Sequence, residues 1–178
     1  MKYVKTALVC VAVALAMAIY WLIARDEVHV NVYCYKSTYY AIIKHGPLID
    51  TTALLWVKEN DKWLVCYLDH EINPGVDFKV IQAERGVIVC TNNVVFASYD
   101  HSSRKIVYSE NYDYVGFPNQ VVWKDDKEGY WSATVVSIGA EGVGTHTPQQ
   151  LTEDYWEVKC ICEIGKAIKA GQVVSLED

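Results

Sequence analysis

The hydrophobic pattern divides the chain into two parts. Residues 7–24 form an uninterrupted apolar run with no charge, no glycine and no proline. An α-helix rises about 1.5 Å per residue and a bilayer core is about 30 Å thick, so a spanning helix needs roughly 20 apolar residues. The run approaches that length and predicts a single transmembrane signal-anchor helix. A short basic tail, residues 1–6, precedes it, and one β-rich extracytoplasmic domain, residues 28–178, follows it.

Charges at the two ends of the run predict its orientation. Lys2 and Lys5 precede it, whereas Asp26 and Glu27 follow it behind Arg25. Because basic flanks tend to remain in the cytoplasm, we expect the following domain to be translocated. Since no asparagine begins an Asn-x-Ser/Thr glycosylation acceptor, a bacterial inner membrane with a periplasmic domain is favoured. The alternative is a cleaved signal peptide, which also has a basic start and an apolar core, and the domain would then be secreted.

Beyond residue 27, short stretches alternate between apolar and polar positions. Every second residue from Val28 to Cys34 is apolar, a period of two that is typical of a half-buried strand. A regular alternation from Tyr155 to Ile164 predicts another strand. The remaining predicted strands are residues 39–43, 53–58, 62–68, 78–83, 87–91, 94–99, 105–109, 120–123 and 130–138.

Turn residues between these stretches predict hairpins. Asn92 and Asn93, for example, tolerate the positive φ angles of tight turns. We therefore predict a mostly β fold, in which the N-terminal helix is followed by one antiparallel β-sandwich, barrel or meander. Residues 139–150, which read GAEGVGTHTPQQ, form the longest stretch typical of turns and are predicted to be a mobile loop.

Composition excludes some classes of function. The chain carries 16 Lys and Arg against 22 Asp and Glu, a formal net charge of −6, and it lacks a cluster of basic residues. Nucleic-acid binding needs such a cluster, so a nucleic-acid partner is not expected. Five of the six cysteines lie in the domain. Two alternatives remain for them, one or two disulfides or free thiols packed in the interior. Cys160 and Cys162 are too close together for a zinc pattern, and neither a metal nor a cofactor is predicted.

Three residues are candidates for acid–base chemistry. They are His70, which lies in an Asp-His-Glu triplet, and the adjacent Asp100 and His101. In a strand, His70 and its two acidic neighbours point to opposite faces, which is wrong for a shared metal site. Asp100 and His101 are followed by two serines, and such neighbours rarely converge as a catalytic triad does. A polar turn is the better interpretation of residues 99–103.

The predicted loop is the leading candidate for an interaction site, because long loops often carry binding residues. Its glycines are not followed by the Lys-Ser/Thr pair of a phosphate-binding loop. The candidate interaction residues are Gly139, Glu141, Gly142, Gly144, Thr145, His146 and Thr147.

These features lead us to expect a membrane-anchored, non-catalytic protein. It would hold membrane lipid through residues 7–24 and bind another protein at the cell envelope, as an inhibitor of a toxin or lytic enzyme does, or as an accessory subunit of an envelope complex does. The alternative is an envelope hydrolase whose site is assembled from dispersed His and Asp residues, including His146.

Overall fold

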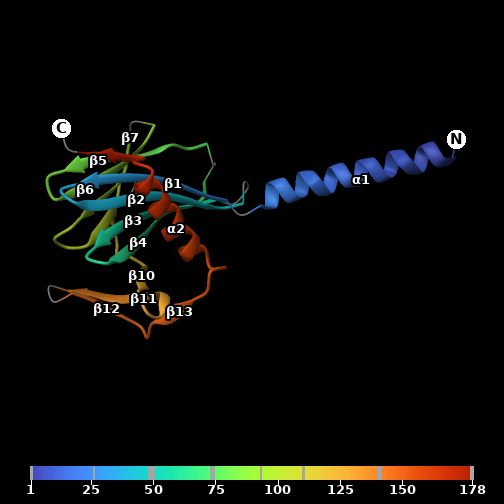
Figure 1. Ribbon diagram of the computed structural model, residues 1–178. Helices are drawn as coiled ribbons and strands as arrows, with labels where there is room; N and C mark the ends of the chain where they lie inside the picture. The colour runs from blue at the N-terminus through green and yellow to red at the C-terminus, as the bar shows by residue number, and fades with distance from the viewer. Residues whose placement is uncertain are drawn as a thin grey trace.

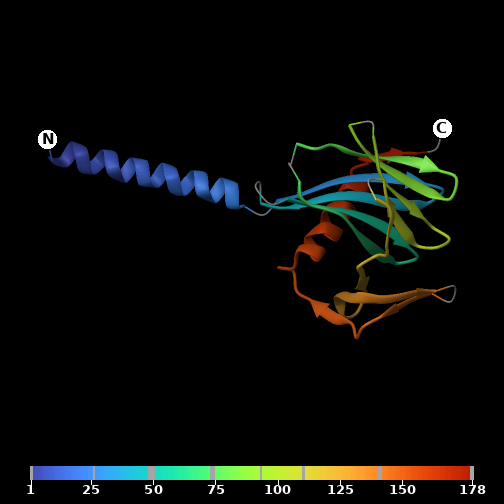
Figure 2. The same cartoon turned by 180° about the vertical axis from the view of Figure 1, so that it is seen from behind.

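The computed structural model describes residues 2–25, 27–47, 51–72, 75–92, 94–109, 111–139 and 142–176. An N-terminal helix, α1 (Lys2–Ala24), projects away from a β-rich domain in both views (Figure 1 and Figure 2). In the part of the chain that is described, no helix combines the length and the apolarity needed to cross a membrane. The predicted transmembrane role of residues 7–24 is therefore not shown by the structure and stays a prediction.

The larger of two sheets contains nine strands. Its order is β12-β11-β10-β4-β3-β2-β1-β14, and β13 also pairs with β11. Neighbouring strands are antiparallel except for β1 and β14, which are parallel. The strands are β1 (Glu27–Tyr35), β2 (Thr38–Gly46), β3 (Thr51–Glu59), β4 (Lys62–Ile72), β10 (Gln120–Asp125), β11 (Gly129–Gly139), β12 (Gly142–Thr145), β13 (Gln149–Leu151) and β14 (Val173–Ser175).

The smaller sheet is a five-stranded antiparallel meander whose spatial order follows the chain. The mostly β prediction is therefore confirmed, and most predicted strands match an observed one to within a few residues. The strands of this sheet are β5 (Phe78–Ala83), β6 (Gly86–Thr91), β7 (Val94–Asp100), β8 (Lys105–Tyr108) and β9 (Asn111–Gly116).

The two sheets face each other across one hydrophobic core. Tyr40 and Leu55 of the large sheet share a buried cluster with Phe78, Val89 and Ile106 of the small sheet. A second cluster lies on the opposite face of the large sheet, beneath helix α2 (Trp156–Lys169). The domain therefore has three layers, with the large sheet in the middle (Figure 1). Burial on both faces explains why residues 40–43 and 53–57 are apolar without alternation.

The predicted strand at residues 155–164 is wrong, because these residues form most of α2. Cys160 and Ile164 share one face of a strand, but, being four residues apart, they also share one helical stripe with Ile168, and this stripe packs against the large sheet. Lysines in the last turn interact favourably with the negative, C-terminal end of the helix dipole. Gly171 then adopts a left-handed φ of 69°, and glycine is the usual residue after a helix end.

Residues 139–150 do not form the one continuous loop that was predicted, although residues 146–148 between two strands carry no regular structure. Residues 142–145 form β12 and residues 149–151 form β13, both paired with β11. The glycines of this segment obscure the strand pattern in the sequence. At position 144 a glycine leaves room for the neighbouring strand, since a Cβ on Gly144 would lie 2.3 Å from Ser137 Oγ. Glu141 lies outside the described residues.

The cysteines do not cross-link the sheets. All six are free thiols, and Cys66, Cys90 and Cys160 are buried. Complete burial raises the pKa of the Cys66 thiol, which keeps it protonated. Of the two alternatives left open by the sequence, the structure shows free thiols, three of them packed in the domain interior.

Candidate functional site

Four tight turns lie at the end of the sandwich opposite α1, which we call the distal end. They are residues 36–37, 60–61, 84–85 and 101–104, and they belong to both sheets. Lys36, Ser37, Asn60 and Arg104 have φ angles between 45° and 66°. Left-handed backbone is uncommon outside glycine, and such positions concentrate at tight turns and functional sites.

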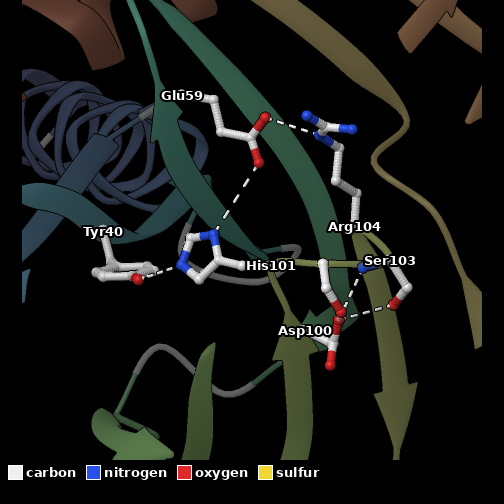
Figure 3. A network of polar contacts seen from close by, with 7 residues as sticks. Tyr40, Glu59, Asp100, His101, Ser103 and Arg104 are labelled. Carbon is white, nitrogen blue, oxygen red and sulfur yellow. Dashed lines mark hydrogen bonds and ion pairs between the residues drawn. The ribbon is translucent and has the colours of Figure 1, made fainter. Parts of the chain in front are cut away.

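A polar network joins the two sheets at the distal end (Figure 3). The Tyr40 hydroxyl of β2 forms a hydrogen bond with His101 Nε2, and His101 Nδ1 lies 4.0 Å from Glu59 Oε1 at the end of β3. Arg104 Nε donates to Glu59 Oε2 at 2.8 Å. His101 and Arg104 come from the β7–β8 turn of the small sheet, so this inter-sheet network connects the layers.

The protonation states within the network are set mainly by burial. Burial lowers the pKa of His101, although the carboxylates of Glu59 and Asp100 oppose it, so the neutral imidazole is favoured. Burial also raises the pKa of Tyr40 to about 12. The Tyr40 hydroxyl therefore donates to Nε2, and the remaining ring N–H faces Glu59. A hydroxyl that is this hard to ionise is a weak nucleophile, and the arrangement is best suited to holding the sheets together.

Asp100 closes the β7–β8 turn and does not hydrogen-bond to His101. Its Oδ1 accepts hydrogen bonds from the Ser102 hydroxyl at 2.5 Å, from the Ser103 N–H at 2.7 Å and from the Ser103 hydroxyl at 3.0 Å. The bond from Ser102 is the largest cause that lowers the pKa of Asp100 to about 2. The predicted polar turn is confirmed.

The other predicted acid–base residues do not join this group. The backbone N–H of His146 donates to the Thr134 carbonyl at 2.9 Å, and in the part of the chain that the structure describes its exposed side chain makes no hydrogen bond to Asp100 or His101. His70 belongs to β4, but its side chain lies outside the described set. The structure therefore brings together Asp100 and His101 alone, as neighbours on one turn.

A cleft of about 570 Å³ lies between the distal end and β12. Its apolar wall is formed by Leu64 of β4, Val121 and Trp123 of β10, and Val143 of β12. We call it the β12 cleft. The other lining residues are Glu59, Asn60, Asp61, Lys62, Arg104, Gly142, Thr145 and Pro148.

The β12 cleft combines an apolar wall with a charged rim. The ion pair of Glu59 and Arg104 lies on the rim, next to Asp61 and Lys62. Lys62 Nζ is 4.7 Å from the centre of the Trp123 ring, a distance at which a cation is attracted to the aromatic face. Apolar pockets with a few fixed polar groups are typical of binding sites.

A second cleft, of about 470 Å³, lies on the other side of the inter-sheet network. Tyr40 and His101 line it, together with Tyr35, Lys36 and Arg85. The network therefore forms part of the wall of both clefts, with Glu59 and Arg104 on one side and Tyr40 and His101 on the other.

Part of the predicted interaction segment lines the β12 cleft. Gly142 and Thr145 contribute to it, whereas Gly139 ends β11 and His146 and Thr147 follow β12. Gly144 does not line it. Sequence reasoning missed the residues that form the opposite wall and the rim, because they belong to β3, β4, β10 and the β7–β8 turn. Leu64, Val121, Trp123, Glu59 and Arg104 are the main residues of that group.

Within the described ranges, no group of three or more His, Cys, Asp or Glu side chains is arranged to hold a metal ion. No protein-family model, curated protein or solved structure matches the chain.

Proposed function

We propose that this protein is a membrane-anchored, non-catalytic β domain that binds another protein at the cell envelope through the β12 cleft. The observation that carries the proposal is the cleft itself, which has an apolar wall, a charged rim and a volume of about 570 Å³. A cavity of this size accepts one or two large apolar side chains and offers polar groups to their surroundings. An inhibitor of a toxin or lytic enzyme, or an accessory subunit of an envelope complex, would use such a site.

Helix α1 is the proposed anchor in a bacterial inner membrane, with the domain in the periplasm. Large apolar side chains cover its surface, and Leu15, Tyr20 and Trp21 are each more than half exposed. Contiguous apolar surface of this kind is unfavourable in water and favourable in lipid. Tyr20 and Trp21 lie near the domain, where aromatic rings favour the membrane interface. Secretion after cleavage of this segment remains the alternative.

Binding is favoured over catalysis because the suspected acid–base groups are already engaged. His101 accepts from Tyr40, and Asp100 accepts from two serines of its own turn. The alternative function is an envelope hydrolase, and the series Glu59, His101, Tyr40 beside the second cleft is the arrangement that favours it. In that series the hydroxyl would have to lose a proton that burial holds in place.

Capture of the partner from envelope membranes tests the proposal. The full chain with a C-terminal tag is compared with Thr145→Arg, which fills the β12 cleft from an exposed strand position. The matched control is Thr147→Arg, which adds the same charge two residues away, outside the cleft lining. We expect one protein to be recovered with the wild type and the control and to be lost with Thr145→Arg.

Equal recovery with all three chains would show that the cleft is not the binding site. The hydrolase alternative is tested in the same preparations with cell-wall polymers as substrate. Turnover by the wild type that disappears in His101→Gln would replace the binding proposal with the catalytic one.

A further inference from the structure

We propose that β12 receives an extended segment of the partner protein as an additional strand, and that one large apolar side chain of that segment occupies the β12 cleft. This inference rests on the proposed protein-binding function and adds the mode of binding and the kind of partner. Its chemistry is backbone hydrogen bonding along a sheet edge combined with one side-chain pocket.

The first observation is the position of β12 at the end of the large sheet. In the described part of the chain, β11 pairs with one edge of β12 and no strand pairs with the other. The N–H of His146, directly after β12, points inward to Thr134 on β11. Backbone groups alternate between the two edges of a strand, so the N–H groups of Thr145 and Val143 point outward. They form a row that another extended backbone can pair with.

The second observation is that the β12 sequence does not block this edge. Natural edge strands are usually protected by lysine, proline or an inward-pointing charge. The four residues of β12 read GVGT and include none of these, whereas the β5 edge of the small sheet carries Lys79. An unprotected edge of this kind is a template for strand addition.

The third observation is the alignment of the edge with the β12 cleft. Val143 and Thr145, two residues apart, face the same side of the sheet, and both line the cleft. A strand added beside β12 would therefore place every second side chain on the cleft side. The apolar wall of Leu64, Val121 and Trp123 suits a tryptophan, phenylalanine or leucine at that position.

This geometry selects an extended segment of another protein over a second copy of β12. Side chains of a second β12 would be two glycines, a valine and a threonine, which are too small to fill about 570 Å³. The rim carries both signs of charge, Asp61 and Lys62 beside the Glu59–Arg104 pair. Uncharged polar residues such as threonine or serine are therefore expected on each side of the large apolar residue.

Peptide binding to the full chain tests the mode. A random 12-residue peptide library is selected against the detergent-solubilised protein, and the tightest peptide is measured by calorimetry. We expect an alternating sequence with one aromatic residue or leucine, and replacement of that residue by serine to weaken binding about tenfold or more. Methylation of alternate peptide amides, which leaves the protein untouched, should weaken binding by a similar factor in one of the two alternating sets.

A proline variant extends the test to the protein edge. Thr145→Pro removes one outward N–H, and edge positions tolerate proline, so the fold should persist while peptide affinity falls about tenfold. Thr147→Pro, beyond the end of β12, is the control and should bind as the wild type does. If neither methylation set nor Thr145→Pro weakens binding, strand addition is wrong.

The captured partner separates this outcome from failure of the proposed function. A partner lost with Thr145→Arg but retained with Thr145→Pro would leave the cleft as the binding site and overturn strand addition. A dimer of the full chain that is abolished by Thr145→Pro would identify a second copy as the occupant and would also overturn the inference. Light scattering measures whether the full chain is a monomer or a dimer.

Discussion

His101 occupies a position in which its charge affects both layers of the sandwich. It accepts a hydrogen bond from Tyr40, packs edge-on against the rings of Tyr40 and Tyr99, and lies near the carboxylate of Glu59. Arg104 and Asp100 are the other charged groups that influence it. Protonation would convert Nε2 from an acceptor into a donor and remove the bond that Tyr40 now makes.

The free energy of unfolding should therefore fall as the pH is lowered through the histidine range. The folded-state pKa of His101 lies below its ordinary value, so the unfolded chain binds a proton first. Stability is fully present above about pH 6.5 and is lost as the pH falls towards the folded-state pKa. Asp100 stays ionised throughout this range because its pKa is about 2. Urea denaturation at pH 7.5 and pH 5.5 measures the effect.

The variant His101→Gln isolates this contribution. It should cost about 1 kcal/mol at pH 7.5, because the bond from Tyr40 is altered, and it should lose less further stability at pH 5.5 than the wild type does. Identical losses in the two proteins between these pH values would contradict the assignment to His101.

At the scale of elements, local pattern predicts strands well and fails where two periods coincide. The strand predicted at residues 78–83 matches β5 (Phe78–Ala83), because alternation and flanking turns agree there. Residues 155–164 were ambiguous, since the apolar positions 160 and 164 satisfy both the two-residue period of a strand and the four-residue spacing of a helical stripe. The decisive signals for α2 lie farther along, in Ile168 and in Gly171 at the helix end.

Two glycine substitutions test the elements with opposite expected signs. Gly165→Ala lies inside α2 with nothing within 4 Å of an added Cβ, so it should stabilise the domain by roughly 0.5–1 kcal/mol. Gly86→Ala, at the start of β6, would bring Cβ to 1.9 Å from the Tyr99 carbonyl oxygen. It should destabilise the domain by about 3 kcal/mol or more, since a backbone clash must move the paired strand. Urea denaturation of both variants gives the comparison, and a neutral Gly86→Ala would contradict the observed packing.

The candidate site could be predicted only in part, because it is assembled by strand order. Gly142 and Thr145 belong to a glycine-rich segment that stands out in the sequence. Trp123 and Arg104 lie in ordinary strand and turn contexts, and they meet Glu59 only because β10 pairs with β4 and the small sheet folds over the large one. The spacing of apolar residues within one segment predicts a strand, but it does not predict which distant strand pairs with it.

At the scale of the whole molecule, the proposed anchor and the proposed binding site lie at opposite ends. Helix α1 precedes β1 at one end of the large sheet (Figure 2). The β12 cleft includes turn residues of the distal end, such as Asn60 and Arg104. An anchored domain would therefore present its cleft away from the bilayer, where a partner can approach.

Substitution within α1 tests the anchor in the full chain. Leu15→Arg places a charge at the middle of the apolar run, at a cost of about 2.5–3.5 kcal/mol for a membrane span, and should release the protein from membranes washed with alkaline carbonate. Leu15→Val keeps the run apolar and should remain in the membrane fraction. A reporter fused after Asp178 that is active only when exported should also be active. Activity of a cytoplasm-only reporter at that point would contradict the orientation.

The parallel pairing of β14 with β1 has a mechanical consequence. β1 follows α1 directly, and it is held by nine paired positions on β2 and three on β14. A backbone hydrogen bond from the Leu176 N–H to the Cys34 carbonyl continues the pairing on the β14 side. If the bilayer fixes α1 while a partner pulls on the distal end, tension runs along β1. Because sheet hydrogen bonds lie across the strand, they would carry this load together, in shear, and the domain would resist being drawn out from its tether.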